Sequence, residues 1–165
     1  MTAVVAIRAS ASSSGQQIPL VANAVCAGHD LLVAVLASGH GADGASWELD
    51  VSGDASGLRT TVNVTLPDGR RPWGGGIGGG PALEPSSRVN AYVGASDEGP
   101  RTFIARVAPD VRAVVVRLSD GTREDLTLHG DAHQLGARVA VLVYPRHLDI
   151  HRVDLYGEDG ETLSE

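Results

Sequence analysis

The sequence predicts an all-β protein: an antiparallel β-sandwich, immunoglobulin-like or related, with about eleven short strands and little or no helix. Two observations lead to this prediction. Alternating β-branched residues fit the pleated, half-buried surface of a strand. The runs at 62–69 and 114–121 both end in Asp-Gly, a dipeptide typical of tight hairpin turns. A weaker copy of this pattern occupies residues 153–160.

The individual strands follow from apolar or alternating runs between turn signals. The runs 18–27 and 31–38 flank Gly28-His29-Asp30, which favours a hairpin. Residues 47–51 place Trp, Leu and Val on one face and acidic residues on the other. Pro145 is expected to end a strand, because proline cannot donate a hydrogen bond to a ladder. In chain order, strands are expected at residues 2–8, 18–27, 31–38, 47–51, 58–66, 88–94, 102–107, 111–118, 123–128, 138–144 and 149–156.

Composition bounds the core and the number of domains. The chain has 165 residues, of which 42% are hydrophobic but only 4% aromatic, so Val, Leu and Ala must fill the core. We expect one unit spanning 1–165. A sub-boundary near the charged turn 97–100 would divide the chain into 1–96 and 101–165, and the second piece would be small for an independent domain.

Charge and missing residue types exclude several functions. The chain has no lysine and a net charge of −7, so a lysine Schiff base, a P-loop lysine and a catalytic Ser-Lys pair are excluded. The acidic balance argues against nucleic acid and anionic membranes as partners. The single cysteine, Cys26, cannot form an internal disulfide. We find no signal peptide or membrane segment and expect a cytoplasmic protein.

Two segments share the pattern His-x-Asp-x-His and are the candidate metal site. They contain His129 and His133 in the first copy, and His147, Asp149 and His151 in the second. On a strand, a spacing of two places such side chains on one face, and imidazole and carboxylate are good zinc ligands. The ends of such a segment lie about 13 Å apart, so a zinc ion would have to take ligands from both segments. The alternatives are two solvated faces or a proton-sensing surface.

The glycine-rich run at 73–81 is the candidate ligand or partner loop. Trp73 at its edge would offer a stacking platform for a sugar, and Ile77 lies in its middle. The run lacks the Lys and Ser/Thr of a P-loop, and no helix follows it, so a phosphate cradle is not expected. The alternative is a flexible packing loop.

From about Leu58 to the end, the chain resembles a set of uncharacterised bacterial β-sandwich accessory proteins. The resemblance rests on residues 74–81, 98–101, 105–111, 119–121 and 159–163. It implies a sandwich fold and a membrane-tethered or exported module of unknown role. Such proteins often carry a cysteine inside the glycine-rich run, where this chain has Ile77, so a disulfide does not carry over.

The leading hypothesis is a non-catalytic β-sandwich that acts as an interaction or structural module, without a cofactor and with a protein as its partner. It rests on the all-β pattern and on the lack of an assembled catalytic constellation in the sequence. A zinc-binding protein or zinc-dependent hydrolase using segments 129–133 and 147–151 is the second hypothesis. A phage or cell-surface structural subunit is the third.

Overall fold

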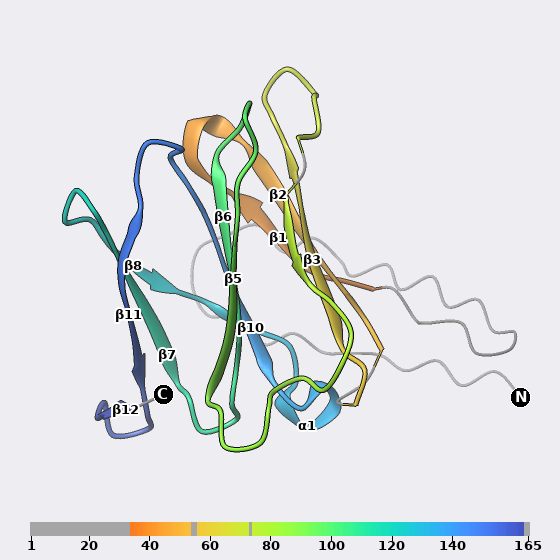
Figure 1. Ribbon diagram of the computed structural model, residues 1–165, viewed down its shortest axis with the longest axis vertical. Helices are drawn as coiled ribbons and strands as arrows, with labels where there is room; N and C mark the ends of the chain where they lie inside the picture. Colours follow the sequence, from red (N-terminus) through yellow and green to blue (C-terminus); the bar gives the residue numbers. More distant parts are fainter. Residues whose placement is uncertain (1–33, 54–55, 73, 164–165) are drawn as a thin grey trace, which may run out of the picture.

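The computed structural model describes residues 34–53, 56–72 and 74–163, and within them nearly all regular structure is β (Figure 1). Twelve described strands form three four-stranded antiparallel sheets, which confirms the predicted all-β, sandwich-like fold. The strands expected at 2–8 and 18–27, the start of the one at 31–38, Cys26 and Trp73 lie outside the described residues.

The three sheets are named by their position in the chain. The N-terminal sheet has the order β1 (Ala34–His40), β2 (Ser46–Ser52), β3 (Arg59–Thr65), β4 (Gly75–Ile77). The middle sheet has the order β5 (Val89–Gly94), β6 (Arg101–Val107), β10 (Arg138–Tyr144), β9 (Leu128–His129). The C-terminal sheet has the order β12 (Thr162–Leu163), β11 (Ile150–Tyr156), β7 (Ala113–Leu118), β8 (Arg123–Leu126).

The sheets are stacked in three layers, with the middle sheet between the other two (Figure 1). One face of β6 presents Phe103, Ala105 and Val107 to a core shared with β7 and β11. Its other face presents Ile104 to a second core shared with β2 and β3. Because both faces of the middle sheet are covered, six consecutive residues of β6 are buried and the strand shows no polar alternation.

Small aliphatic side chains fill both cores, as the composition predicts. The core against the C-terminal sheet contains two buried aromatic rings, Phe103 and Tyr144. The core against the N-terminal sheet is built from alanine, valine, leucine and isoleucine, with Trp47 packed at its margin.

The three Asp-Gly sites form turns of one kind. In each, the glycine has a positive φ, between 76° and 89°, and its N–H donates to the residue three positions earlier. The N–H of that earlier residue donates to the carbonyl of the residue four positions after it. This pair of hydrogen bonds defines a three-residue hairpin loop that ends in a left-handed glycine. The loops begin at Leu66, Leu118 and Gly157.

The aspartates of the first two turns stabilise them through their side chains. Asp68 accepts from the N–H of Arg70 at 3.0 Å, and Asp120 from that of Thr122 at 2.9 Å. These bonds favour the ionised form and lower the pKa of both carboxyls; the side chain of Arg70 makes the largest contribution at Asp68. The third turn differs, because there Glu161 accepts from the N–H of Asp159.

The structure contains four elements that the sequence did not predict. The 3₁₀ helix η1 (Ala42–Gly44) lies between β1 and β2. The short strand β4 lies within the glycine-rich run and pairs with β3. The helix α1 (Ala132–Leu135), one turn long, replaces part of the expected polar loop. The strand β12 pairs with the end of β11. Among the described residues, no helix has the length and apolar character needed to span a membrane.

The buried guanidinium of Arg106 joins the middle sheet to the N-terminal sheet. It is fully buried in β6 and donates to the carbonyl oxygens of Leu58 and Ile77, at 2.6 and 2.5 Å. It also donates to Thr60 Oγ1 at 3.3 Å. Desolvation lowers the pKa of Arg106, and neutral oxygens rather than a carboxylate receive its hydrogen bonds in the described part of the chain. Arg106 therefore ties the strand β4 to the rest of the fold.

A candidate ligand pocket at the β8–β9 bend

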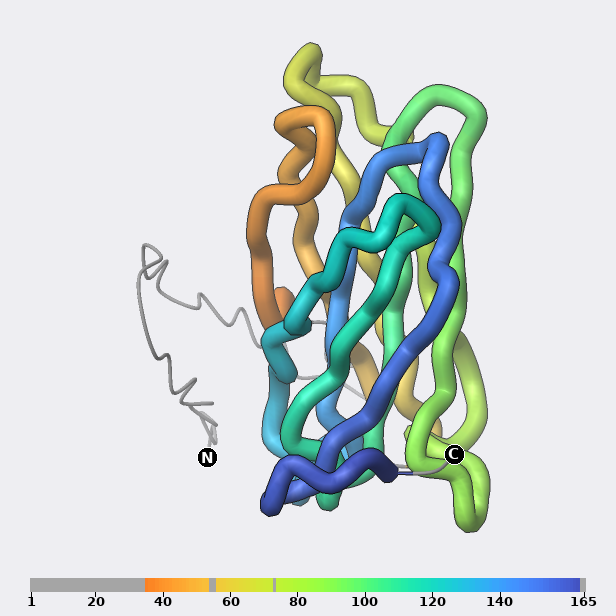
Figure 2. Tube along the Cα trace, turned by 90° about the vertical axis from the view of Figure 1, so that its left-hand side faces the viewer, coloured from red at the N-terminus to blue at the C-terminus, as the bar shows by residue number. Residues whose placement is uncertain are grey.

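A single extended segment passes from the C-terminal sheet into the middle sheet and opens a pocket where it bends. Its first part, β8, pairs with β7, and its second part, β9, pairs with β10. Thr127 lies at the change of partner, so the single strand expected at 123–128 is two strands in two sheets. Figure 2 shows this segment running beside β1 at the edge of the molecule.

The pocket has a volume of about 290 Å³ and lies between β1, β2, β8, β9 and β10. Val141 and Val143 of β10 form its apolar floor. Its walls carry rings, hydroxyls and a carboxylate, namely Ser38, His40, Trp47, Asp125, Thr127 and His129. Polar groups that converge around an apolar floor are a common feature of small-molecule sites.

Trp47 is the largest side chain that lines the pocket. It lies on the inner face of the N-terminal sheet, two residues before the fully buried Leu49. Its cross-strand neighbour is Gly39, and a Cβ on residue 39 would lie only 2.7 Å from the indole Cζ2. The indole can lie over β1 only because residue 39 has no side chain.

His129 faces Trp47 from the middle sheet. It pairs with Val139, a member of the core that the N-terminal sheet covers. The His129 and Trp47 rings meet edge to face, with centroids 6.1 Å apart and planes at 67°. Burial disfavours the imidazolium and lowers the pKa of His129 below its ordinary 6.5. The ring is therefore neutral at pH 7, with one nitrogen that donates and one that accepts.

The remaining polar groups lie on the rim of the pocket. Ser38 and His40 are exposed on β1, and Thr127 is exposed at the bend. Asp125 is ion-paired with Arg123 at 2.8 Å, and both side chains are more than half exposed. The rim therefore offers both hydrogen-bond donors and acceptors.

The two histidine segments lie at opposite ends of β10. His129 is paired near the start of that strand, while His147 follows its end. The strand β10 is seven residues long, so its two ends lie about 20 Å apart. Within the described residues, no group of three or more His, Cys, Asp or Glu side chains is placed to hold a metal ion.

The first segment is not the uniform strand face assumed for it. Asp131 caps α1 and accepts from the N–H of His133 at 2.8 Å, so His133 lies on the helix and is exposed. Only His129 of this segment reaches the pocket.

The second segment is a turn followed by the start of β11. His147 is exposed in the turn, and the exposed Asp149 carboxylate is ion-paired with Arg101. His151 is exposed in β11, where the register with β7 shifts between Ile150 and Arg152, as in a β-bulge. Leu148 is buried, and Ile150 packs against the same core.

Ile77 lies in β4, where its carbonyl accepts from Arg106 and its side chain packs against the core. It does not line the pocket. Sequence reasoning did not place Trp47, His40 and Asp125 in one site. A usable signal was present in Gly39-His40-Gly41, because small residues beside a strand that carries tryptophan leave room for the ring.

Comparisons of the chain with protein-family models, curated proteins and solved structures found no match.

Proposed function

We propose that this protein is a non-catalytic binding module whose pocket at the β8–β9 bend takes a small neutral polyhydroxylated ring, such as a monosaccharide unit. The edge-to-face pair of Trp47 and His129 at the pocket carries the proposal. It combines an apolar aromatic surface with a neutral imidazole that can donate and accept hydrogen bonds.

The chemistry of the walls matches such a ligand. A sugar ring has an apolar face of C–H groups and a periphery of hydroxyls, which suits an aromatic side chain surrounded by polar groups. Ser38 and Thr127 contribute hydroxyls, and Asp125 contributes carboxylate oxygens as acceptors. A volume of about 290 Å³ has the size of one small ring rather than of an extended chain.

The module is expected to bind and not to react. Among the described residues of the pocket, neither Ser38 nor Thr127 is hydrogen-bonded to a base, and the Asp125 carboxylate is held by Arg123. A nucleophile needs a base within hydrogen-bond reach to be activated. The pocket therefore supports recognition better than acyl or glycosyl transfer.

The test uses the fluorescence of Trp47. The chain has two tryptophans, so Trp73→Phe leaves Trp47 as the only source of tryptophan emission. We expect a saturable change in emission with at least one member of a panel of mono- and disaccharides. His129→Ala should lower the affinity for that saccharide by about tenfold, because the ligand loses a hydrogen bond to the neutral imidazole and a contact with its ring.

His133→Ala is the matched control, since it removes an exposed histidine outside the pocket. It should leave the affinity unchanged. The proposal fails if no saccharide gives a saturable signal, or if His133→Ala weakens binding as much as His129→Ala does.

A further inference from the structure

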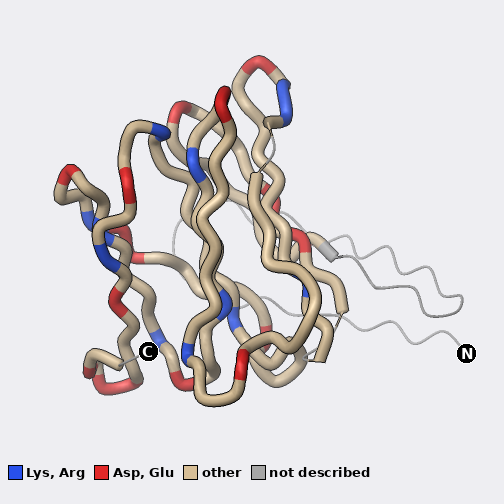
Figure 3. Tube along the Cα trace, in the orientation of Figure 1, with Lys and Arg blue, Asp and Glu red and all other residues tan. Residues whose placement is uncertain are grey.

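Three arginines stand side by side on the outer face of the C-terminal sheet. In the register of the strands, Arg152 of β11 lies opposite Arg117 of β7, and Arg117 lies opposite Arg123 of β8. Like charges directly opposite one another in a sheet are destabilising. This side of the molecule carries several Arg segments close together in Figure 3.

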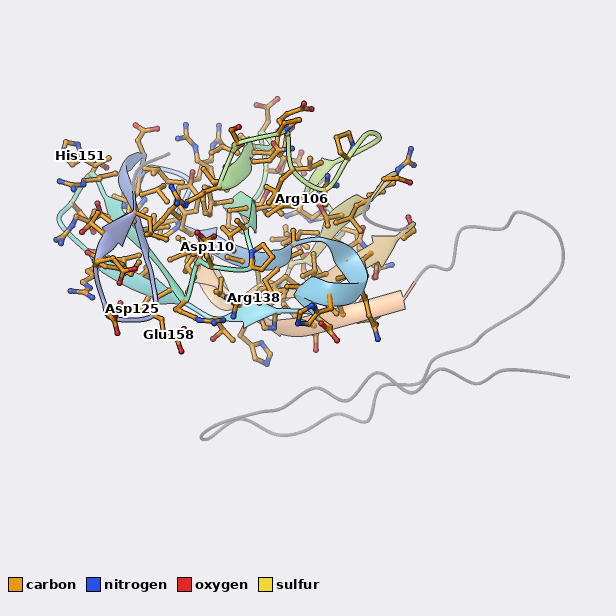
Figure 4. The ribbon with its side chains drawn as sticks, turned by 90° about the horizontal axis from the view of Figure 1, so that it is seen from below. Arg106, Asp110, Asp125, Arg138, His151 and Glu158 are labelled. Atoms are coloured by element: carbon orange, nitrogen blue, oxygen red, sulfur yellow. The ribbon has the colours of Figure 1, made fainter. Side chains whose placement is uncertain are left out.

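The bulge at His151 is what places Arg152 in this row. Ile150 is paired with Leu118, so without the shift residue 151 would oppose Arg117 and Arg152 would point into the core. The extra residue moves Arg152 to the outer face and lets Val153 pack inward with Ile150. Figure 4 shows His151 on the C-terminal sheet, at the edge of the molecule.

A buried carboxylate fixes two of the three guanidinium groups. The side chain of Asp154 is only 4% exposed and accepts from Arg152 Nε at 2.5 Å and from Arg117 Nε at 3.5 Å. The arginine side chains themselves are 61% and 44% exposed. In the part of the chain that the structure describes, both partners of Asp154 are held through Nε, and their Nη atoms donate to no protein acceptor.

We propose that Arg117 and Arg152, oriented by Asp154, form a binding site for a tetrahedral oxyanion, namely a phosphate or sulfate ester. This site is separate from the pocket and does not depend on the sugar proposal. A guanidinium anchored through Nε keeps its Nη donors directed outward in a rigid fork, which is the geometry that binds oxyanions. Adjacent strands lie about 4.8 Å apart, so one oxyanion can bridge the two arginines.

A single ester group fits this surface better than a polyanion does. Arg123 pairs with Asp125 through Nη2, one of the outward donors, so it is less available than its two neighbours. The whole chain carries a net charge of −7, which repels a nucleic acid or another long polyanion. The proposed site therefore consists of two oriented arginines and accommodates a single ester group.

The test is a titration of ¹⁵N-labelled protein with methyl phosphate and with methyl sulfate, at constant ionic strength set by chloride. The Nε–Hε signals of Arg117 and Arg152 should shift saturably with one dissociation constant. Arg112 is the internal control: it is 48% exposed and paired with Glu158 at 3.4 Å, outside this row. The Nε–Hε signal of Arg112 should not show a saturable shift with the dissociation constant found for Arg117 and Arg152.

The two esters distinguish the source of the anion. At pH 7.5 a phosphate monoester carries nearly two charges and a sulfate ester one, since the second phosphate pKa is about 6. Tighter binding of methyl phosphate that is lost at pH 5.5 assigns the site to phosphate esters. Equal or tighter binding of methyl sulfate assigns it to sulfate esters. Either result supports the site.

Asp154→Asn separates orientation from charge. It adds one positive charge, so simple electrostatic attraction would tighten binding, whereas loss of the orienting carboxylate should weaken it about tenfold. Arg152→Lys is the second variant: it keeps the charge, removes the fork and should also weaken binding about tenfold. The proposal is overturned if neither ester gives a saturable shift, if all exposed arginines respond alike, or if both variants bind as tightly as the natural chain.

Discussion

The indole of Trp47 occupies the space that a side chain on Gly39 would need. A Cβ on residue 39 would lie 2.7 Å from Cζ2 and 2.9 Å from Cε2 of the ring. Real Cβ atoms do not come so close to another heavy atom, so either the ring or the strand would have to move. The placement of the tryptophan that lines the pocket thus depends on a glycine in the neighbouring strand.

Gly39→Ala should destabilise the protein and disturb the pocket together. Overpacking of this kind costs about 1–3 kcal/mol of unfolding free energy, measured by chemical denaturation. The emission of Trp47 in the Trp73→Phe background should change as the ring moves. Gly57→Ala is the control, because a Cβ there would meet no atom within 4 Å. Equal stabilities of the two variants would show that the ring moves without cost.

The protonation of His129 should be visible in the stability of the protein. Its folded pKa lies below the ordinary value of 6.5 because burial disfavours the imidazolium. Below about pH 6.5 the unfolded chain therefore binds more protons at this residue than the folded chain, and stability falls as pH decreases. Above that pH the contribution of His129 to the unfolding free energy is fully present and no longer depends on pH.

Comparing the natural chain with His129→Gln from pH 4.5 to 8 by urea denaturation checks this. The difference in unfolding free energy between the two should be constant above about pH 6.5 and should shift against the natural chain as pH falls below it. His133→Gln serves as the reference, since His133 is exposed outside the pocket. A difference that grows in the opposite direction would mean that the folded protein favours the charged ring.

Arg106→Met should loosen β4. The carbonyl groups of Leu58 and Ile77 lose their buried donor, which costs about 2–3 kcal/mol after the gain from no longer burying a guanidinium. Amide exchange at Gly76, in the middle of β4, should accelerate more than at the centre of β10. Arg59→Gln, an exposed change on the neighbouring strand β3, should leave both measurements unchanged. A Met variant as stable as the natural chain would show that the desolvation of Arg106 outweighs its hydrogen bonds.

His151 is the extra residue of the bulge, so neither its side chain nor its presence should be essential to the fold. His151→Ala removes an exposed imidazole and should change the unfolding free energy by less than about 0.5 kcal/mol. Deleting residue 151 removes the bulge but leaves Arg152 opposite Arg117 and Val153 opposite Val116, so the later side chains of β11 keep their faces. Thermal unfolding of the deletion variant should therefore remain cooperative; loss of the cooperative transition would contradict the register described here.

The sequence predicted β3 from its alternation, because side chains of period two divide between core and solvent, and the burial of this strand alternates. The continuous apolar run 138–144 matches β10 in full, because both faces of the middle sheet are covered, and Pro145 follows its last residue. The glycines of β4 carry no such pattern, since its position is set by backbone pairing with β3 and by Arg106, a residue far along the chain. The helix α1 is a single turn and too short to show a helical period.

The pocket could not be predicted, for a different reason. The contact between Trp47 and His129 depends on where one strand leaves the C-terminal sheet and joins the middle one. The stretch 123–128 has an ordinary strand pattern, and nothing in it marks Thr127 as the point of exchange. The histidine pattern identified His129 as a candidate but offered no information on its partner from β2.

The strand shared by two sheets has a mechanical consequence. For the C-terminal sheet to slide over the middle sheet, the segment β8–β9 would have to release its ladder on one side or the other. These two layers therefore open only as a unit. The N-terminal sheet shares no strand with them in the described chain, and side-chain packing and the hydrogen bonds of Arg106 hold it in place. We therefore expect the N-terminal sheet to separate first in mild denaturant, and the contact between Trp47 and His129 to be lost with it.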